Sequence, residues 1–503
     1  MRRSLNFRAR PRATSLPEDI AMSPEETLDP ADWEEFARVA HAMVDDAIAY
    51  TRGVGGRPVW QAMPDAVRAG FNAPAPRGPA PLADIRGDLN QRLMPFPMGN
   101  IHPRFWMWYM GASNLTGALG DFLAAVQGSN LGGGNHAAVL MDQQVVDWLK
   151  ELIGFPTTAS GSLVSGGSVA NLIGLTVARN AGTDIDLREH GVAALPKPLR
   201  FYGSDQIHSC HQKSVETLGL GNRALRRIRT ARDCRMDIDA LARAIAEDRA
   251  AGWQPACVIA TAGTVNTGAV DDLPAIARLC HDEGLWMHVD GCIGALGGLA
   301  PRHRDLVAGL EEADSIALDP HKWLHAPFEV GCIVIRDPAA HLRSFRLTPE
   351  YLETASRGVA AGDWLFDYGL QTSRGFRALK VWMALKEHGA EKFGRIIDQN
   401  IDQAHYFAEC LQGLPDFELV APTTLDIVCF RYRPKGMAEA ELRPLNIEIM
   451  LRLQEEGIAA LSDTTVHDVH CLRAAICNHR TRRQDIDLVI GEIRRIGAEI
   501  SGH

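Results

Sequence analysis

Several short apolar runs in the middle of the chain are each followed by polar residues of the kinds that bind ligands or react. These runs alternate with helical patterns, which is typical of parallel strands joined by crossover helices. Ligands of such sheets bind beyond the carboxyl ends of the strands. We therefore expect one ligand-binding edge that carries Gly166-Gly167-Ser168, His208, Thr261, Asp290 and His321-Lys322.

A helix with an apolar stripe is predicted to follow Ser165-Gly166-Gly167-Ser168. Its start would offer free backbone amides, a hydroxyl and the positive end of the helix dipole, which together suit an anion such as phosphate. The dipole contributes only about 0.3 to 1 kcal/mol at exposed sites, so a tightly held phosphate also needs side-chain donors. A capped helix after a tight Gly-Gly turn would explain the same residues without a ligand.

Asp290 and Lys322 are the charged residues at this edge with the clearest chemical potential. Asp290 ends the apolar run 285–289, so its carboxylate would be buried and would need a cationic partner. A protonated ring nitrogen would serve, and so would an internal salt bridge or a helix cap. Lys322 precedes Trp323, and a lysine in such surroundings is often covalently occupied or shifted in pKa. A lysine that extends to the surface fits the same position.

Two other kinds of site can be drawn from the same residues. The pattern Gly166-x-Ser168-x-Ala170 approximates the nucleophile elbow of serine hydrolases, and Ser168, Asp290 and His321 occur in hydrolase order. An alanine in place of the second glycine weakens this hypothesis, and Lys322 is left without a role. Histidines and cysteines gather at 208–211 and 467–479, but neither set has the paired spacing of a zinc site. Local periodicity should scatter these side chains over different faces, so we predict no metal.

The elements that must position these residues follow from hydrophobic periodicity. The clearest unit is a strand at 257–260, a helix at 273–280 closed by Gly284, and a strand at 285–289. Further strands are expected at 316–318, 330–335, 427–432 and 472–476. A helix at 30–52 precedes a proline-rich stretch, 73–81, which reads as a connector between an N-terminal helical segment and the main body. We predict a disordered basic arm (1–28), an N-terminal helical segment (29–112), a large domain (113–379) and a small α+β domain (380–503).

Composition narrows the class of protein. The 503 residues are 46% hydrophobic and 23% charged, as in ordinary multidomain globular proteins. A net charge of −10 gives no overall positive field, so nucleic acid is not expected as a partner. No run of about 18 apolar residues and no secretory signal are visible, and ten cysteines occur without a CxxC pair, which predicts a cytoplasmic protein without membrane contact. The arginines near the N-terminus could also belong to a transit peptide.

Nine short segments in order carry more information than any one of them. They are HPRF at 102, SGGSVAN at 165, SDQIHSC at 204, ATAGT at 260, HVDGC at 288, DPHKW at 319, TPEYL at 348, SRGFRALKVW at 373 and LRAAIC at 472. Together they resemble the group II pyridoxal-phosphate-dependent amino acid decarboxylases, which act on aromatic amino acids, glutamate or cysteine sulfinate. The resemblance implies the α/β fold of type I (aspartate-aminotransferase-like), with a mostly parallel central sheet. It also implies pyridoxal 5′-phosphate as cofactor and an obligate homodimer with active sites at the subunit interface.

The resemblance implies a role for each residue at the ligand edge. Lys322 would hold the cofactor as a Schiff base and Asp290 would pair with its pyridine nitrogen. His208 would stack on the ring, with Thr261 near its polar edge. The phosphate would be held by Gly167, Ser168 and His321. Asp319 occupies a position that the family also uses there, although a carboxylate would repel the phosphate unless it is protonated or turned away.

The product depends on a residue outside this edge. In the family, Tyr351 matches the tyrosine of a mobile loop that closes from the other subunit and protonates the quinonoid intermediate, giving an amine. Oxygen attack on the unprotonated intermediate would give an aldehyde and ammonia. Related aldehyde synthases often carry phenylalanine at this position, so Tyr351 favours the amine.

The substrate is suggested by the segment after HPRF, Trp106 to Gly111, which is rich in aromatic residues. Trp108, Tyr109 and Gly111 are the candidate substrate-binding residues, and they favour an aromatic L-amino acid. The polar, glycine-rich segment 128–135 stands where aromatic decarboxylases have bulky apolar groups. Acidic, sulfinic and diamino acids therefore stay open as substrates. Arg473 falls on a family arginine near the substrate, where a structural role fits as well.

Overall fold

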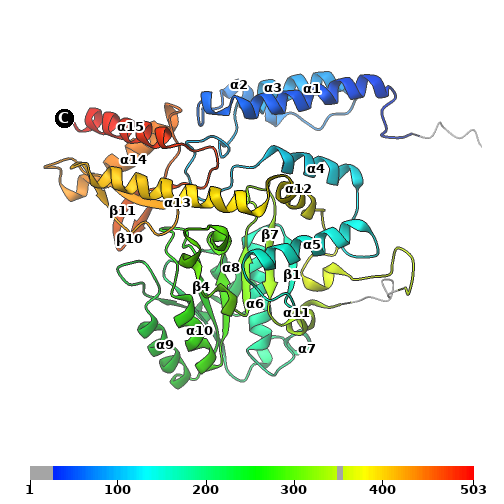
Figure 1. The fold of residues 1–503 in the computed structure, drawn as a ribbon, viewed down its shortest axis with the longest axis vertical. Helices are drawn as coiled ribbons and strands as arrows, with labels where there is room; N and C mark the ends of the chain where they lie inside the picture. Colours follow the sequence, from blue (N-terminus) through cyan, green and yellow to red (C-terminus); the bar gives the residue numbers. More distant parts are fainter. Residues whose placement is uncertain (1–25, 348–354, 503) are drawn as a thin grey trace, which may run out of the picture.

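Short runs of small and β-branched apolar residues build the central sheet. The computed structural model describes residues 26–347 and 355–502 and orders this sheet β1-β7-β6-β5-β4-β2-β3 (Figure 1). Of the seven strands, β7 runs antiparallel to both neighbours and the other pairings are parallel. The strands are β1 (Ser160–Val164), β2 (Leu199–Ser204), β3 (Leu225–Ile228), β4 (Gln254–Thr261), β5 (Trp286–Asp290), β6 (Ser315–Leu318) and β7 (Gly331–Ile335).

Helices cover both faces of this sheet, which is why its central strands are apolar on both sides. Along β4, Cys257 and Ile259 pack with helices α6 and α8 on one face. The alternate residues Val258 and Ala260 pack with α9 and α10 on the other face. The covering helices are α5 (Ala137–Leu152), α6 (Gly167–Ala181), α7 (Leu187–His190), α8 (Cys210–Thr217), α9 (Ile238–Ala250), α10 (Leu273–Glu283) and α11 (Pro338–Phe345).

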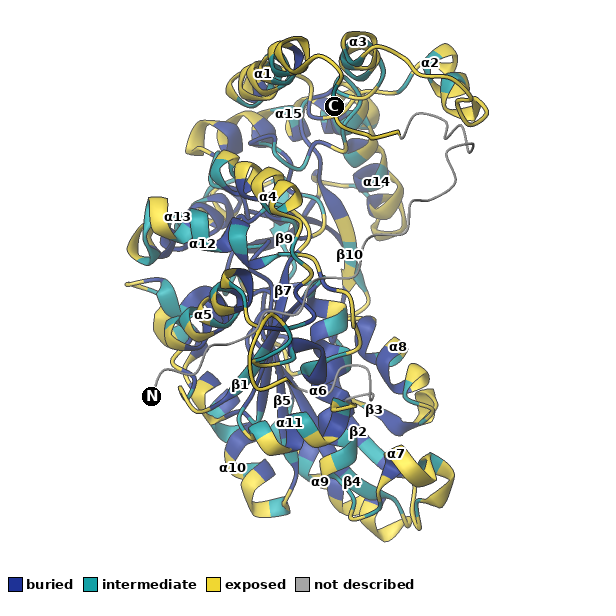
Figure 2. Cartoon of the chain, turned by 90° about the vertical axis from the view of Figure 1, so that its right-hand side faces the viewer, coloured by how far each residue is buried: buried dark blue, intermediate teal, exposed yellow. Residues whose placement is uncertain are grey.

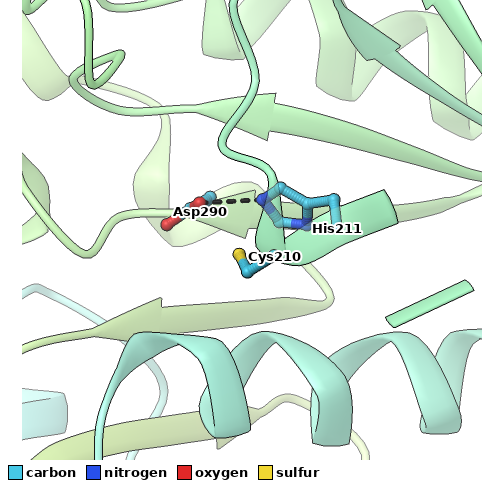
Figure 3. Close-up of side chains that lie close together, drawn as sticks. All are labelled: Cys210, His211 and Asp290. Atoms are coloured by element: carbon cyan, nitrogen blue, oxygen red, sulfur yellow. Dashed lines mark hydrogen bonds and ion pairs between the residues drawn. The ribbon is translucent and has the colours of Figure 1, made fainter. Parts of the chain in front are cut away.

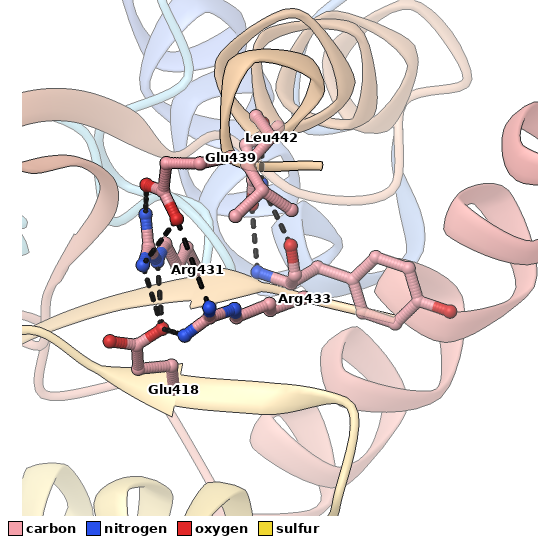
Figure 4. A network of polar contacts seen from close by, with 7 residues as sticks. Glu418, Arg431, Arg433, Glu439 and Leu442 are labelled. Atoms are coloured by element: carbon pink, nitrogen blue, oxygen red, sulfur yellow. Dashed lines mark hydrogen bonds and ion pairs between the residues drawn. The ribbon is translucent and has the colours of Figure 1, made fainter. Parts of the chain in front are cut away.

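The C-terminal part forms a separate hydrophobic core around a smaller antiparallel sheet in the order β10-β11-β9-β8. Beside this sheet, Arg431 and Arg433 bind Glu418 of β8 and Glu439 of α14, which ties the strands to that helix (Figure 4). The elements are β8 (Phe417–Leu419), β9 (Ile427–Tyr432), β10 (Ser462–Val466), β11 (Val469–Ala475), α13 (Ala390–Gln412), α14 (Glu439–Glu455) and α15 (Arg483–Ser501). The predicted α/β fold with a smaller α+β domain is confirmed.

The N-terminal helices lie together at one end of the molecule (Figures 1 and 2). The stretch 73–81 is extended, as predicted, but it joins two helices of this layer instead of separating the layer from the main body. An ion pair of 2.7 Å between Asp46 of α1 and Arg86 of α3 joins these two helices, so α3 belongs to the same layer as α1. The helices are α1 (Trp33–Arg52), α2 (Asp65–Ala69), α3 (Leu82–Arg92) and, nearer the main body, α4 (Leu115–Gln127) and α12 (Ala378–His388).

Some predictions stay open after this description. Residues 1–25, which form most of the predicted basic arm, and Tyr351 lie outside the described residues. The domain boundaries after residues 28, 112 and 379 remain predictions. Among the helices that are described, none combines the length and the apolar character needed to cross a membrane.

His341 of α11 provides a test of the core through pH. Its fully buried ring receives a hydrogen bond from Ser160 and donates one to the carbonyl of Tyr368, and burial lowers its pKa to about 4. In the unfolded chain the pKa of a histidine is about 6.5. Between pH 6.5 and 4 the unfolded chain therefore binds more protons at this residue than the folded protein does. The contribution of the neutral His341 to folding stability is complete above pH 6.5 and is lost as the pH falls towards 4. We expect His341→Leu to lower the thermal midpoint at pH 7.5 and to weaken its decline between pH 6.5 and 4.5. Parallel declines in the two proteins would contradict the buried, neutral state.

Candidate active site

A cavity of about 740 Å³ lies where the carboxyl ends of the central strands face the C-terminal domain. Met450 of α14 and Asp463 of β10 contribute to its wall from that domain. Most of the residues singled out from the sequence line this one cavity: Trp108, Tyr109, Gly167, Ser168, His208, Thr261, Asp290, Asp319, His321, Lys322 and Arg473. Gly111 is not among the lining residues.

Lys322 lies in the turn after β6 with its amine inside the cavity wall. Its Nζ is 3.1 Å from Oδ2 of Asp319 and 5.7 Å from the centre of the Tyr109 ring. Burial lowers the pKa of Lys322, but the negative charges of Asp319 and Asp290 and the hydrogen bond to Asp319 outweigh this and raise it. The result is a buried amine held in place by a carboxylate, directly beside an aromatic ring.

Asp290 is the last residue of β5, and both of its carboxylate oxygens are bound. Oδ2 lies 2.8 Å from Nε2 of His211 (Figure 3). Oδ1 accepts a hydrogen bond from the backbone N–H of Cys292 at 3.2 Å. Burial raises the pKa of Asp290, but the bonds and charge of His211 together with the Cys292 bond overcome it and hold the pKa well below its usual range. Asp290 is therefore a fixed, buried negative charge.

His211 was considered from the sequence only as part of a histidine and cysteine cluster. The prediction that such side chains scatter over different faces was wrong for two of them, because possible ligand atoms of Cys210, His211 and Asp290 all lie within 4.8 Å of one another (Figure 3). The spacing of His208 and His211 across the start of α8 was the available signal. In the second cluster the side chains do diverge, since His470 binds Asp463 while His479 binds the carbonyl of Ser113.

His208, which follows β2, and Thr261, at the end of β4, also line the cavity. Nδ1 of His208 accepts the backbone N–H of Cys210 at 3.2 Å, which fixes the ring. The backbone N–H of Thr261, the last residue of β4, donates to Asp271, whereas its buried hydroxyl has no hydrogen-bond partner among the described residues. An orphaned buried hydroxyl at a cavity wall suits a polar group of a ligand.

The start of α6 has the features expected of an anion site. Among the described residues no side chain caps the helix at Gly166, so the amides of Gly167 and Ser168 are available, while those of Val169 and Ala170 donate to the carbonyl of Gly166. Gly167 is required there, since a Cβ atom would lie 2.3 Å from Sγ of Cys292 and 2.8 Å from Oδ2 of Asp319. The carboxylate of Asp319 therefore packs against the backbone of Gly167 at the helix start. Its Oδ1 is buried and has no hydrogen-bond partner among the described residues.

His321 is oriented by its neighbours and is held neutral. Nδ1 donates to the carbonyl of Val330 at 2.7 Å, and burial lowers the pKa of the imidazole. The hydrolase hypothesis is therefore wrong: Asp290 binds His211 instead of His321, and Ser168 makes no hydrogen bond to His321 in the part of the chain that is described.

Trp108 and Arg473 are joined at the opening of the cavity. Trp108 adopts a left-handed backbone conformation, with a φ of 51°, and its side chain is nearly half exposed. This conformation is rare for a bulky residue, and its carbonyl accepts a hydrogen bond from Nη1 of Arg473. Arg473 also donates to the carbonyl of Asn266. Its buried Nη2 has no hydrogen-bond partner among the described residues, so its N–H groups are left to donate to an oxygen of a ligand.

Tyr109 and Gly111 shape the cavity from behind. The hydroxyl of Tyr109 donates to Asp426 at 2.7 Å, which leaves its ring beside Lys322. Gly111 packs against the backbone of His321 and Lys322, where a Cβ atom would lie only 1.8 Å from the carbonyl oxygen of His321. The absence of a side chain at Gly111 is what allows the turn with the lysine to lie where it does.

A buried lysine, a fixed carboxylate and an open helix start around one cavity define an enzyme that holds a phosphorylated ring cofactor. A family described as the pyridoxal-dependent decarboxylase conserved domain matches residues 64–433. The chain belongs to this family and is a pyridoxal-phosphate-dependent amino acid decarboxylase.

Known proteins resemble the chain over most of its length. An aromatic-L-amino-acid decarboxylase of Bacillus atrophaeus is 34% identical over 477 residues, which cover 93% of this chain and 96% of the relative. The crystal structure of Oryza sativa TDC with PLP and tryptamine superposes with a TM-score of 0.86 at 27% identity, covering 94% of this chain and all of that one. Mouse CSAD in apo form gives 0.84 at 26% identity, covering 92% of this chain and 98% of that one. The fold alone therefore does not select a substrate.

Gly111→Ala tests the packing behind Lys322. Because the new methyl group would overlap the carbonyl of His321, we expect the turn to shift and the protein to bind pyridoxal phosphate at least about tenfold more weakly, as overpacking typically costs 1 to 3 kcal/mol. Titration of the purified protein with the cofactor, followed by absorbance, measures this. Gly491→Ala, where no atom lies within 4 Å, is the control. Equal affinities in both variants would contradict the interpretation.

Proposed function

We propose that the protein decarboxylates an aromatic L-amino acid to the corresponding amine and CO2. The observation that carries this proposal is the placement of Lys322, Asp290 and Trp108 around a single cavity. Met107 and Met450 add apolar surface to the same cavity, which suits a planar side chain. The 34% identity to an aromatic-L-amino-acid decarboxylase across almost the whole chain supports the same substrate class.

We assign the cofactor ring to residues at the carboxyl ends of β2, β4, β5 and β6. Lys322 would carry the aldehyde carbon, Asp290 would pair with the ring nitrogen, and His208 would lie against the ring. The unpartnered hydroxyl of Thr261 supports its place at the polar edge. Bound pyridoxal phosphate withdraws electrons from the bond that releases CO2. A fixed negative charge at Asp290 would keep the ring nitrogen protonated, which strengthens that withdrawal.

We assign the phosphate to the start of α6. The free amides at Gly167 and Ser168 and the hydroxyl of Ser168 would donate to it, and the ring of His321 would lie beside it. Because Nδ1 of His321 donates to Val330, its Nε2 would donate to the phosphate only in the protonated ring, which the phosphate charge favours. Asp319 would not contact the phosphate as a charged group, because it pairs with Lys322 and lies behind Gly167. Its role would be to hold the lysine amine until the cofactor arrives.

We assign the substrate to the space bounded by Trp108 and Arg473. The side chain of the amino acid would lie against Trp108 and the ring of Tyr109, with Gly111 supporting them from behind. The unpartnered Nη2 of Arg473 would bind one carboxylate oxygen and so orient the bond that breaks. Tyr351, known here only from the sequence, would deliver a proton to the carbon from which CO2 has left.

A diamino acid is the second candidate substrate. Glu329 and Asp463 line the same cavity as Asp290 and Asp319, and these four carboxylates would attract a basic side chain. They also disfavour acidic and sulfinic amino acids. All four already have a partner, since Glu329 pairs with Arg377 and Asp463 with His470, while Asp290 pairs with His211 and Asp319 with Lys322. The aromatic class therefore remains the stronger proposal.

Mass spectrometry of the products from a panel of aromatic, basic and acidic L-amino acids tests the reaction. We expect an amine from the aromatic members. Lys322→Ala should lose covalent attachment of the cofactor and slow turnover at least about 100-fold, in the range for removal of one positioned reacting side chain. Lys150→Ala removes another lysine with little exposure, which lies outside the cavity, and it should keep both properties. An aldehyde with ammonia would instead indicate the oxidative branch, and no loss in Lys322→Ala would refute the assignment.

We also propose that the enzyme is a homodimer. Helix α4 turns its glycines inward, where Gly117 meets Pro327 and Gly120 meets the backbone of Lys380. Its large apolar residues point outward, and the exposed stripe consists of Leu115, Leu119, Phe122, Leu123 and Val126. A contiguous apolar surface of this kind marks an interaction site. A second copy of the chain is the partner that the family resemblance implies.

Phe122→Glu tests this assembly. The substitution would bury a charge in each half of the interface, so we expect dissociation at least about 100-fold more readily, consistent with several kcal/mol for an unpaired buried charge. Sedimentation velocity over a concentration series measures the change. Leu488→Glu, which alters an exposed leucine on α15, is the matched control and should remain dimeric. A wild-type protein that sediments as a monomer would contradict the proposal.

We place the enzyme in the cytoplasm with small molecules as its other partners. All ten cysteines are free thiols, which suits a reducing compartment. The net charge of −10 does not favour binding to nucleic acid.

A further inference from the structure

His211 contacts the buried carboxylate of Asp290 without lining the cavity itself. Its Nε2 lies 2.8 Å from Oδ2 of Asp290, and the ring has no exposed surface (Figure 3). Asp290 lies between His211 and the cavity, since only Asp290 of the two is part of the cavity wall. His211 can therefore affect the cavity only through neighbours that line it, of which Asp290 is the one it binds at 2.8 Å and Cys210 is the other.

The two hydrogen bonds to Asp290 restrict how its carboxylate can turn. His211 holds Oδ2, and the backbone N–H of Cys292 holds Oδ1. The terminal torsion of an aspartate is broad and has no sharp minimum of its own. The orientation of this carboxylate is therefore set by its partners, and His211 is the one that a substitution can remove.

The surroundings of His211 leave Asp290 as its one carboxylate partner in the described residues. The neighbouring His288 is committed elsewhere: it accepts from Ser315, donates to Asn171 and has its pKa lowered to about 3 by burial. The start of α8, where His211 lies, disfavours a positive charge because it is the positive end of the helix dipole. The pKa of His211 is nevertheless raised: burial lowers it, but Cys210 and Asp290 overcome this.

We propose that His211 is a positioning residue for the cofactor, whose Nε2–H holds the carboxylate of Asp290 in the orientation that meets the ring nitrogen. The proposal rests on the assignment of Asp290 to that nitrogen in the proposed function. It requires no contact between His211 and either cofactor or substrate. It predicts that loss of the N–H donor weakens cofactor binding even when the protein folds and Lys322 is intact.

A metal ion is the competing use of the same residues. Atoms of Cys210, His211 and Asp290 lie close enough to share one ion. If the ion bound Nε2 of His211, that nitrogen could not also donate to Asp290. Metal analysis of the purified holoenzyme separates the two.

The experiment compares two substitutions of His211 in the full-length protein. His211→Leu removes the donor, while His211→Gln can place an amide N–H near the position of Nε2. Each protein is titrated with pyridoxal phosphate, and the affinity and the visible absorption of the bound cofactor are recorded. His341→Leu, which removes another fully buried histidine far from Asp290 in the sequence and outside the cavity wall, controls for a general loss of packing.

We expect His211→Leu to bind pyridoxal phosphate at least about tenfold more weakly, equivalent to about 1.4 kcal/mol, with altered absorption. His211→Gln should recover to within about threefold of wild type, and His341→Leu should bind as wild type. Wild-type affinity and absorption in His211→Leu would overturn the proposal, as would a glutamine variant as weak as the leucine variant. Stoichiometric metal in the wild type that is lost in both His211 variants would also overturn it.

This readout is independent of the substrate. If no aromatic amino acid yields an amine while the titrations behave as expected, the proposed function fails and the role of His211 stands. If the amine forms but the His211 variants bind the cofactor normally, the opposite holds.

Discussion

The active site depends on several charged side chains that stay ionised at the wall of one cavity. Asp290 is buried and the side chain of Lys322 is only 15% exposed, so each charge needs a partner there. The chain supplies Asp319 for the lysine and His211 for the aspartate, and both partners come from turns or helix starts at the carboxyl ends of strands. The parallel sheet matters for function because it brings these otherwise distant segments to a single edge.

Close backbone packing makes this charge arrangement rigid. Gly167 lets the start of α6 lie against Asp319, and Gly111 lets another segment press on the turn that carries Lys322. Any side chain at either position would meet an atom at a distance below van der Waals contact. The two glycines therefore fix the start of α6 beside Asp319 and the turn that carries the amine of Lys322.

Much of the fold followed from local patterns, because buried strands leave clear apolar runs. The strand predicted at 427–432 has those bounds in the structure, and the residues expected at the ligand edge line one cavity. The patterns missed β11 by three residues at its start, because His467 and Asp468 form a tight left-handed turn without glycine. They also missed the pairing of His211 with Asp290 and the place of α3 against α1, since both depend on contacts between segments far apart in the sequence. The motif match supplied the residue roles, which spacing alone left open.

The guanidinium of Arg473 joins three remote parts of the chain. It binds the carbonyls of Trp108 and Asn266 and the hydroxyl of Ser462, and it holds Trp108 in its unusual backbone conformation. During synthesis the central sheet can form long before residue 473 emerges, because domains fold as units from the N-terminal side. The wall of the cavity next to Trp108 is therefore completed only when translation is almost finished. A chain that ends or is cut before Arg473 could retain the sheet and still lack this wall of the cavity. The cavity next to Trp108 is thus complete only in a chain that includes residue 473.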